Sequence, residues 1–200
     1  MIRTRKDLKA YLIADALVHG VKTDNIKDKI FYLCFDRIWK FHKLLRQVEY
    51  YKNNDRNILI ECYYQFLRYR LSKIAINLGF SIPANVCGPG LSLPHYGSII
   101  INAQAKIGCN CMIHSCVNIG ANGGSAKAPI IGNNVFIGPG AKIYGDIRIA
   151  DNVYIGANAV VNKSILEKNA VVIGIPGKII KYEKLVWWQK NRLNLPTVLI

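Results

Sequence analysis

The segment Ile131 to Val161, IGNNVFIGPGAKIYGDIRIADNVYIGANAVV, places an aliphatic residue at every sixth position. These residues are Ile131, Ile137, Ile143, Ile149, Ile155 and Val161. The residue four places after each of the first five is apolar and modest in size: Val135, Ala141, Ile147, Val153 and Ala159. Six steps of about 100° do not return to one face of an α-helix, whereas in extended chain every second residue faces the same way. The segment is therefore predicted to be extended, with both series on one face.

The same period runs upstream of this segment. Its members there are Ile101, Ile107, Ile113 and Ile119, with Ala105, Cys111 and Val117 in the second series. Gly and Asn cluster between them, where a corner needs a positive φ. A repeat this short is typical of a solenoid, and three short faces with three corners per turn predict a triangular coil. The register breaks between Ile119 and Ile131, so part of GANGGSAKAP (120–129) is predicted to leave the coil as a loop.

Residues 1 to about 79 are predicted to be helical. Apolar residues recur at i, i+3, i+4 and i+7 spacing in 25–51 and again in 58–80, with Lys and Arg between them. Asp24 and Asn25 offer a cap before the first of these helices, and Gly79 can close the last one.

Length and composition are those of a globular protein. The chain has 200 residues, of which 51% are hydrophobic and 20% charged. No apolar run reaches the roughly 18 residues that span a bilayer. The basic N-terminus contains Asp7 and Asp15 and lacks a continuous apolar stretch, so it is interpreted as a helix and not as a signal peptide. A cytoplasmic location is expected.

The six cysteines do not resemble a disulfide framework. Cys87 and Cys111 fall where small buried residues are wanted, and a reducing compartment fits this use. The spacing of Cys109, Cys111 and Cys116 matches no common zinc signature, so buried packing thiols and no metal are predicted.

The net charge of +15 indicates anionic partners. A phosphate-rich cofactor, an acidic polymer, an anionic membrane surface and nucleic acid all satisfy charge alone. The tyrosines of the basic half fall on helical patterns and no recognised binding motif is present, so nucleic acid is not expected as a partner.

From about Pro83 to Ile180 the chain resembles the hexapeptide-repeat acyltransferases. This resemblance implies a left-handed parallel β-helix and a homotrimer with active sites in clefts between adjacent solenoids. Three units follow: an N-terminal helical region (1–80), the β-helix acetyltransferase domain (81–180) and a C-terminal tail or helix (181–200).

Within that family the likeness is to serine acetyltransferases and to similar polysaccharide O-acetyltransferases. The segment PANVCGPGLSLPHYGSIIINAQAKIG (83–108) matches, without gaps, the segment that holds their catalytic histidine. The resemblance assigns that role to His95, whose neutral imidazole would take the proton of a hydroxyl attacking a thioester. His114 lies about one coil further on and is expected at the same corner. It is a second catalytic candidate, and a surface imidazole is the alternative.

The resemblance implies acetyl-CoA as the donor, lying along a groove where small residues let it approach the backbone. Candidate donor-binding residues in the groove are Gly120, Ala121, Gly138, Gly140, Ala141, Gly156 and Ala159. Lys178 and Lys181, in the closing segment GIPGKIIKYEK (174–184), are candidates for contacting the nucleotide phosphates. The alternatives are that the glycines only turn corners and that the lysines are solvated.

Three departures from the serine enzymes point to a different acceptor. Pro94 and Phe80 stand where those enzymes have carboxylates, which would suit the ammonium group of an amino acid. Ala128 stands where they carry a second histidine. The expected acceptor is therefore a sugar hydroxyl of a bacterial capsular, exo- or lipopolysaccharide or of its precursor, acidic or lipid-linked. Serine O-acetylation in cysteine biosynthesis is one alternative, and a non-catalytic solenoid for assembly or binding is another.

The chain closes with KLVWWQKNRLNLPTVLI (184–200). Trp187 and Trp188, with flanking basic residues, resemble an interfacial amphipathic segment. Packing against the solenoid end or a neighbouring subunit is favoured over peripheral contact with the inner face of the membrane.

Overall fold

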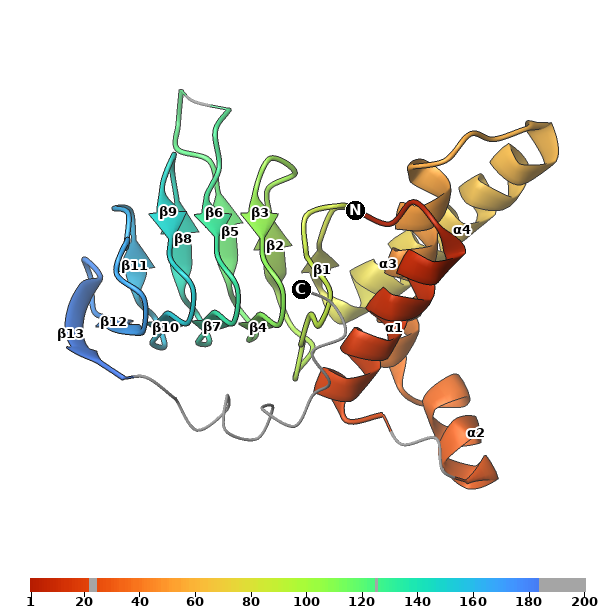
Figure 1. Ribbon diagram of the computed structural model, residues 1–200, viewed down its shortest axis with the longest axis horizontal. Coiled ribbons are helices and arrows are strands. Elements are labelled where there is room, and N and C mark those ends of the chain that lie inside the picture. Colours follow the sequence, from red (N-terminus) through yellow and green to blue (C-terminus); the bar gives the residue numbers. More distant parts are fainter. Residues whose placement is uncertain (22–24, 125, 184–200) are drawn as a thin grey trace.

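The computed structural model of the protein describes residues 1–21, 25–124 and 126–183. Helices lie at one end of the molecule, and a stack of short strands forms the rest (Figure 1). No helix within those ranges combines the length and apolar character needed to cross a bilayer. The predicted cap at Asp24 and the tail with Trp187 and Trp188 lie outside the described residues.

The described helices lie between Arg5 and Leu78, and one predicted helix is divided. Asn25 caps the helix predicted from residue 25, and Gly79, with a φ of 76°, ends the last helix as expected. A single helix over 25–51 was wrong, because Asp36 accepts a hydrogen bond from the backbone nitrogen of Trp39 at 2.7 Å and caps a new helix there. The helices are α1 (Arg5–His19), α2 (Ile26–Cys34), α3 (Arg37–Lys52) and α4 (Ile58–Leu78).

The strands form three sheets that the chain visits in turn, which gives the three-sided coil that the six-residue period predicts. The sheets have the orders β1-β2-β5-β8-β11, β3-β6-β9 and β4-β7-β10-β12-β13, and every pairing is parallel except β12 with β13. Their bounds are β1 (Phe80–Ser81), β2 (Ile99–Ile101), β3 (Lys106–Ile107), β4 (Met112–Ile113), β5 (Asn118–Gly120), β6 (Ile130–Ile131), β7 (Phe136–Ile137), β8 (Lys142–Tyr144), β9 (Arg148–Ile149), β10 (Tyr154–Ile155), β11 (Val160–Val161), β12 (Ala170–Ile173) and β13 (Lys178–Tyr182).

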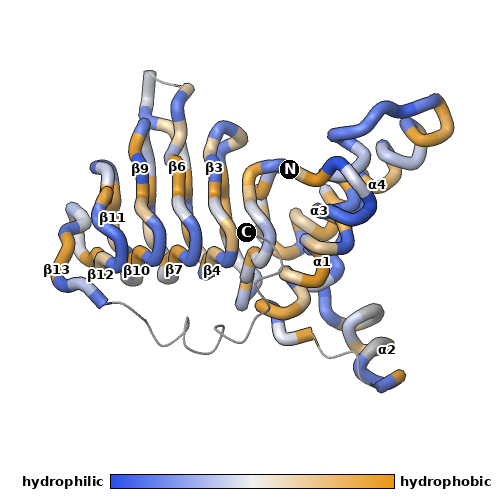
Figure 2. Tube along the Cα trace, viewed as in Figure 1, coloured by the Kyte–Doolittle hydropathy of each residue, from blue (hydrophilic) through white to orange (hydrophobic). Residues whose placement is uncertain are grey.

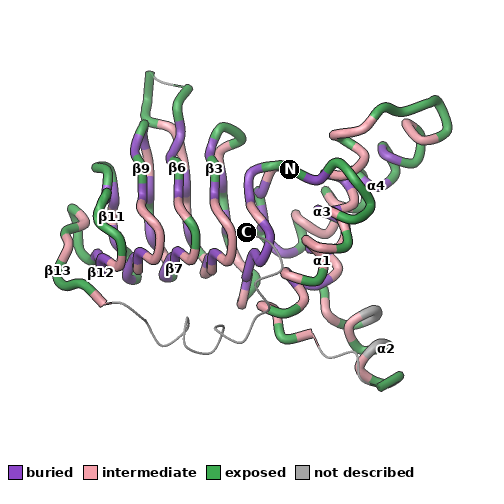
Figure 3. The backbone as a smooth tube through the Cα atoms, viewed as in Figure 1, coloured by how far each residue is buried: buried purple, intermediate pink, exposed green. Residues whose placement is uncertain are grey.

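The aliphatic residues of both series fill the interior of the coil. Within residues 131–161, every residue of the two series has a relative exposure of at most 6%. Hydrophobic and hydrophilic stretches succeed one another around the coil (Figure 2). Most of the two- and three-residue strands combine a buried residue with an exposed or half-buried one, as in Lys106–Ile107 and Arg148–Ile149, whereas both residues of β7 are buried (Figure 3). The strand register places equivalent aliphatic residues of adjacent coils beside each other: Ile113 pairs with Ile137, and Ile137 pairs with Ile155. Each coil therefore buries its apolar residues against the coils stacked on it, and the same core includes Phe41 and Leu45 of α3.

The predicted loop leaves the coil between β5 and β6, where the chain projects beyond the strands (Figure 1). Gly123 and Gly124 are exposed, and a Cβ at either would meet open space. The loop explains why the step from Ile113 to Ile137 is six residues longer than the step from Ile137 to Ile155.

The cysteines agree in part with the prediction of buried thiols. Cys87 and Cys111 are buried in the core, and Cys109 is half-buried. Cys116 is exposed, which corrects the prediction for that residue. It occupies a corner with a φ of 63°. Among the described residues, the other non-glycine residues with a positive φ are asparagines: Asn85, Asn110, Asn134, Asn152, Asn158 and Asn169.

Replacing Cys116 with asparagine should therefore raise the free energy of unfolding by about 1 kcal/mol, because asparagine tolerates the left-handed conformation and cysteine is strained there. Urea denaturation followed by circular dichroism measures the change. Cys62→Asn is the matched control, because Cys62 is also exposed but lies within α4. A gain of equal size in both variants would contradict a corner-specific origin.

Candidate active site

His95 is held at the start of the coil stack by its buried neighbours. Ser92 forms a parallel bridge with Met112, and Leu93 is fully buried in the core. The chain then emerges, so that His95 is exposed. This pairing brings His95 beside His114, with ring centroids 5.8 Å apart and an interplanar angle of 49°. The structure thus brings together the two imidazoles that the coil length places at one corner.

His114 directly follows β4 and presents an unsatisfied nitrogen. Its backbone N–H donates to the carbonyl of Ile137 at 3.0 Å, which fixes the residue against the next coil. Its Nε2 atom is buried and has no hydrogen-bond partner. Burial, and secondarily the neighbouring His95, lower the pKa of His114 below its ordinary value, so the ring is neutral at neutral pH. A half-buried neutral imidazole whose inner nitrogen lacks a partner can form a further hydrogen bond once that nitrogen is reached.

An aromatic row continues from this pair along the sheet. The ring of Phe136 lies 5.0 Å from that of His114, and Tyr154 stacks on Phe136 at 4.4 Å with an interplanar angle of 3°. Sequence reasoning missed both residues as part of this surface. A signal was present, because each immediately precedes an inward-facing isoleucine and the two lie on adjacent coils.

In the part of the chain that the structure describes, no carboxylate is bonded to the imidazole pair. Within the described ranges, no hydrogen bond or ion pair joins His95 or His114 to an aspartate or glutamate. Phe80, which stands where the serine enzymes carry a carboxylate, is instead buried against Phe41 with ring centroids 5.1 Å apart. Ala128 is also buried, at the base of the loop. The pair therefore has no anionic orienting partner from this part of the chain.

The small residues predicted to line the donor groove differ in accessibility. Gly120 and Ala121 are half-buried where β5 meets the loop, and Gly140 has a left-handed φ of 76° at a corner. Gly138 and Gly156 are required by coil stacking: a Cβ at Gly138 would lie 2.8 Å from the backbone nitrogen of Ala157, and one at Gly156 would lie 2.7 Å from Ile173. The side chains of Ala141 and Ala159 are fully buried in the core.

The two candidate phosphate-binding lysines lie on β13, at the end of the stack away from the helices (Figure 1). Lys178 is exposed, and Lys181 pairs with Glu183 at 3.0 Å. Four strand spacings of about 4.8 Å separate β4 from β13, or about 19 Å.

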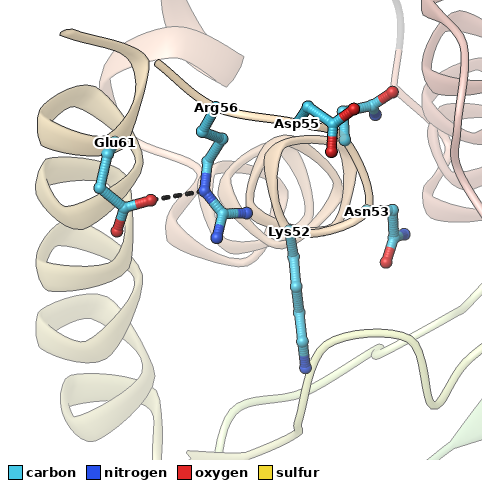
Figure 4. A pocket seen from close by; sticks show the side chains of 6 residues that line it. Lys52, Asn53, Asp55, Arg56 and Glu61 are labelled. Atoms are coloured by element: carbon cyan, nitrogen blue, oxygen red, sulfur yellow. Dashed lines mark hydrogen bonds and ion pairs between the residues drawn. The ribbon is translucent and has the colours of Figure 1, made fainter. Parts of the chain in front are cut away.

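A pocket of about 380 Å³ opens elsewhere, on the helical region between α3 and α4. Figure 4 shows its polar lining and the ion pair between Arg56 and Glu61, at 2.5 Å. It contains none of the predicted site residues. In the part of the chain that the structure describes, no three His, Cys, Asp or Glu side chains gather as a metal site requires.

Comparisons with known proteins support the resemblance. Residues 128–163 match the family model "Bacterial transferase hexapeptide (six repeats)". A serine acetyltransferase of Mycobacterium tuberculosis is 38% identical over 100 residues, covering 49% of this chain and 43% of the relative. One of Staphylococcus epidermidis is 40% identical over 103 residues, covering 50% and 48%. The chain spans less than half the length of these curated relatives.

The fold is also similar to that of a solved structure. The serine acetyltransferase of Neisseria gonorrhoeae superposes with a TM-score of 0.69 at 22% identity, covering 92% of this chain and 70% of that one. These findings confirm the likeness to hexapeptide-repeat transferases of the serine acetyltransferase type. They favour the serine alternative over the sugar hydroxyl that the departures at Phe80, Pro94 and Ala128 predict, and give no support to a role in capsule or polysaccharide synthesis.

Proposed function

We propose that the protein is an acetyl-CoA-dependent O-acetyltransferase and that its acceptor is the hydroxyl group of serine. The observation that carries this proposal is the identity of 38–40% to proteins named serine acetyltransferase. The pairing of His95 with His114 supports it, because it supplies a base beside a free hydrogen-bonding nitrogen.

In the proposed reaction, His95 accepts the proton of the acceptor hydroxyl as the oxygen attacks the acetyl carbonyl carbon of acetyl-CoA. A C–O bond forms and a tetrahedral intermediate results. Its collapse breaks the C–S bond, and the coenzyme A thiolate leaves and recovers the proton from His95. His114, whose ring centroid lies 5.8 Å from that of His95, positions the acceptor beside the base.

The proposed donor site runs from the imidazole pair toward β13. The backbone at Gly120, Ala121 and Gly140 lines it, and Lys178 contacts the phosphates. Ala141 and Ala159 are left out of it because they are fully buried. The proposal includes the left-handed winding and the homotrimer that the resemblance implies, with each donor groove completed by an adjacent solenoid.

A sugar hydroxyl is a second candidate acceptor. The observation that favours it is the absence of a carboxylate on either imidazole among the described residues. An amino-acid acceptor brings an ammonium group, whose desolvation needs an anionic partner. A neutral alcohol has no such requirement.

The test is thiol release from acetyl-CoA with L-serine and with a panel of neutral and acidic sugars. Release with serine supports the first candidate, and release with a sugar alone supports the second. Absence of release with every acceptor would overturn the enzymatic proposal and leave a non-catalytic solenoid.

A carboxylate introduced beside His95 should improve serine binding. Pro94→Asp is expected to lower the KM for serine about tenfold, because a hydrogen bond to a charged group contributes about 1.5–3 kcal/mol. Steady-state kinetics with varied serine measure the change. Pro94→Asn is the matched control, since it has similar size without the charge. An equal drop in KM for both variants would show that removing proline, and not adding a carboxylate, is responsible.

A further inference from the structure

A buried network of charged side chains joins the helices to the coil stack. Arg46 on α3 is fully buried, as is Asp15 on α1. The Arg46 Nε atom donates to Asp15 Oδ2 at 2.7 Å, and its Nη1 atom donates to Glu49 Oε2 at 2.9 Å. Burial alone would raise the pKa of Asp15, but the charge of Arg46 and the nearby His42 lower it to about 2. The carboxylate is therefore ionised at neutral pH.

The network holds the backbone of the segment 85–91, which leads directly to His95. Arg46 donates to the carbonyls of Cys87 at 2.8 Å and Gly88 at 2.7 Å. Asp15 Oδ1 accepts from the backbone nitrogens of Gly90 at 2.8 Å and Leu91 at 3.0 Å. Side chains of two helices thus bind both backbone N–H donors and backbone carbonyl acceptors of one short segment.

Glu49 extends these contacts back to Asn85, because its Oε1 atom accepts a hydrogen bond from the backbone nitrogen of Asn85 at 2.8 Å. The residues that follow transmit the constraint. The backbone nitrogen of Ser92 donates to the carbonyl of Cys111 at 2.9 Å, and that of Ile113 donates to the carbonyl of Ser92 at 2.9 Å. The segment before His95 is therefore fixed to the helices on one side and to the coil that carries His114 on the other.

Stability alone does not account for a buried network of charged side chains. Burying charges carries a large desolvation cost, and well-packed apolar residues of similar volume are often as stabilising. Ion pairs and bidentate hydrogen bonds instead fix direction and distance closely. Apolar packing at this junction would leave the segment 85–91 freer to shift along the helices.

We propose that Asp15 and Arg46 are positioning residues for His95: they hold the segment 85–91 so that the imidazole stays in register with His114 and with the acceptor. This inference rests on the proposed role of His95. Neither residue touches the reacting atoms, and both act through the backbone that precedes the histidine.

The test uses Asp15→Asn and Arg46→Lys in the full chain. Asp15→Asn keeps an oxygen acceptor for Gly90 and Leu91 but loses the charge that binds Arg46. Arg46→Lys keeps the charge but loses the planar fork that reaches both carbonyls and Asp15. The matched controls are Asp55→Asn and Arg37→Lys, both at exposed positions of the helical region.

The expected result is a fall in kcat of about tenfold to a hundredfold with an unchanged KM for acetyl-CoA, because a small displacement of a catalytic group has an effect of this size. Amide hydrogen exchange should rise in residues 85–95 and stay unchanged in the coils from β7 to β11. The controls should match the unmodified protein in both measurements. If Arg46→Lys does not fold, the kcat and the hydrogen exchange of Asp15→Asn alone test the positioning role.

Unchanged kcat in the folded variants, or a rise in exchange throughout the chain, would overturn the positioning role. The result is separable from the proposed function. Loss of turnover in His95→Ala with normal turnover in Asp15→Asn overturns only this inference, whereas normal turnover in His95→Ala overturns the catalytic proposal itself.

Discussion

Replacing His95 with alanine is expected to lower kcat for acetyl transfer by about 10²–10⁴-fold, the usual contribution of a general base. The alcohol would then have to attack the thioester without losing its proton to a positioned group. Because His95 is exposed and makes no hydrogen bond to another side chain in the described part of the chain, its removal should leave the fold intact. Steady-state thiol release measures the loss, and circular dichroism and gel filtration establish that the variant is folded.

Two further variants sharpen this test. His95→Asn keeps a polar group of similar reach without a base of suitable pKa, so it should be as impaired as His95→Ala. His19→Gln is the matched control, because His19 lies on α1, where it pairs with Asp36 at 2.8 Å. It should keep the turnover of the unmodified protein. Full turnover in His95→Asn would refute the base role and point to hydrogen bonding as the contribution of the histidine.

The second large effect concerns stability. Replacing Ile143 with alanine should lower the free energy of unfolding by about 2–5 kcal/mol. Ile143 is fully buried and pairs with Ile119 on one side and Val161 on the other. Its truncation removes apolar contacts from three stacked coils at once, and a closely packed interior closes such a cavity only in part. Urea denaturation followed by circular dichroism measures the loss.

Ile100 provides the control for this prediction. It lies on β2 in the same sheet but faces outward and is 45% exposed. Ile100→Ala should change the free energy of unfolding by less than about 1 kcal/mol, as exposed substitutions usually do. Similar losses for the two variants would mean that Ile100 is covered by a neighbouring subunit, which gel filtration then detects.

The architecture of the coil could be predicted from the sequence because its contacts repeat locally. Each aliphatic position meets its own counterpart one coil away, so the six-residue period is itself a description of the packing. The loop at 120–129 was visible as an interruption of that period, and the approach of His114 to His95 followed from coil length. The helix end at Gly79 followed from the freedom of glycine to adopt a positive φ.

Features that depend on contacts between distant parts of the chain could not be predicted from the sequence. The helix break at Asp36 places that residue beside His19, which lies 17 positions away in the sequence. The unpaired Nε2 atom of His114 depends on how tightly the rings around it pack. Neither leaves a periodic trace, since no repeat relates the residues involved.

By itself, then, the sequence determined the coil, the loop, the helical character of the first 79 residues and the histidine pair. Only the tertiary structure decided which charged residues of the helices are buried and what they hold: Asp15 meets Gly90 from 75 positions away, and Arg46 meets Cys87 from 41. The reason is physical. Stacked coils bury one face at a fixed residue period, so the sequence must repeat that period. A helix packs on a coil through contacts that each occur once, so they leave no period in the sequence.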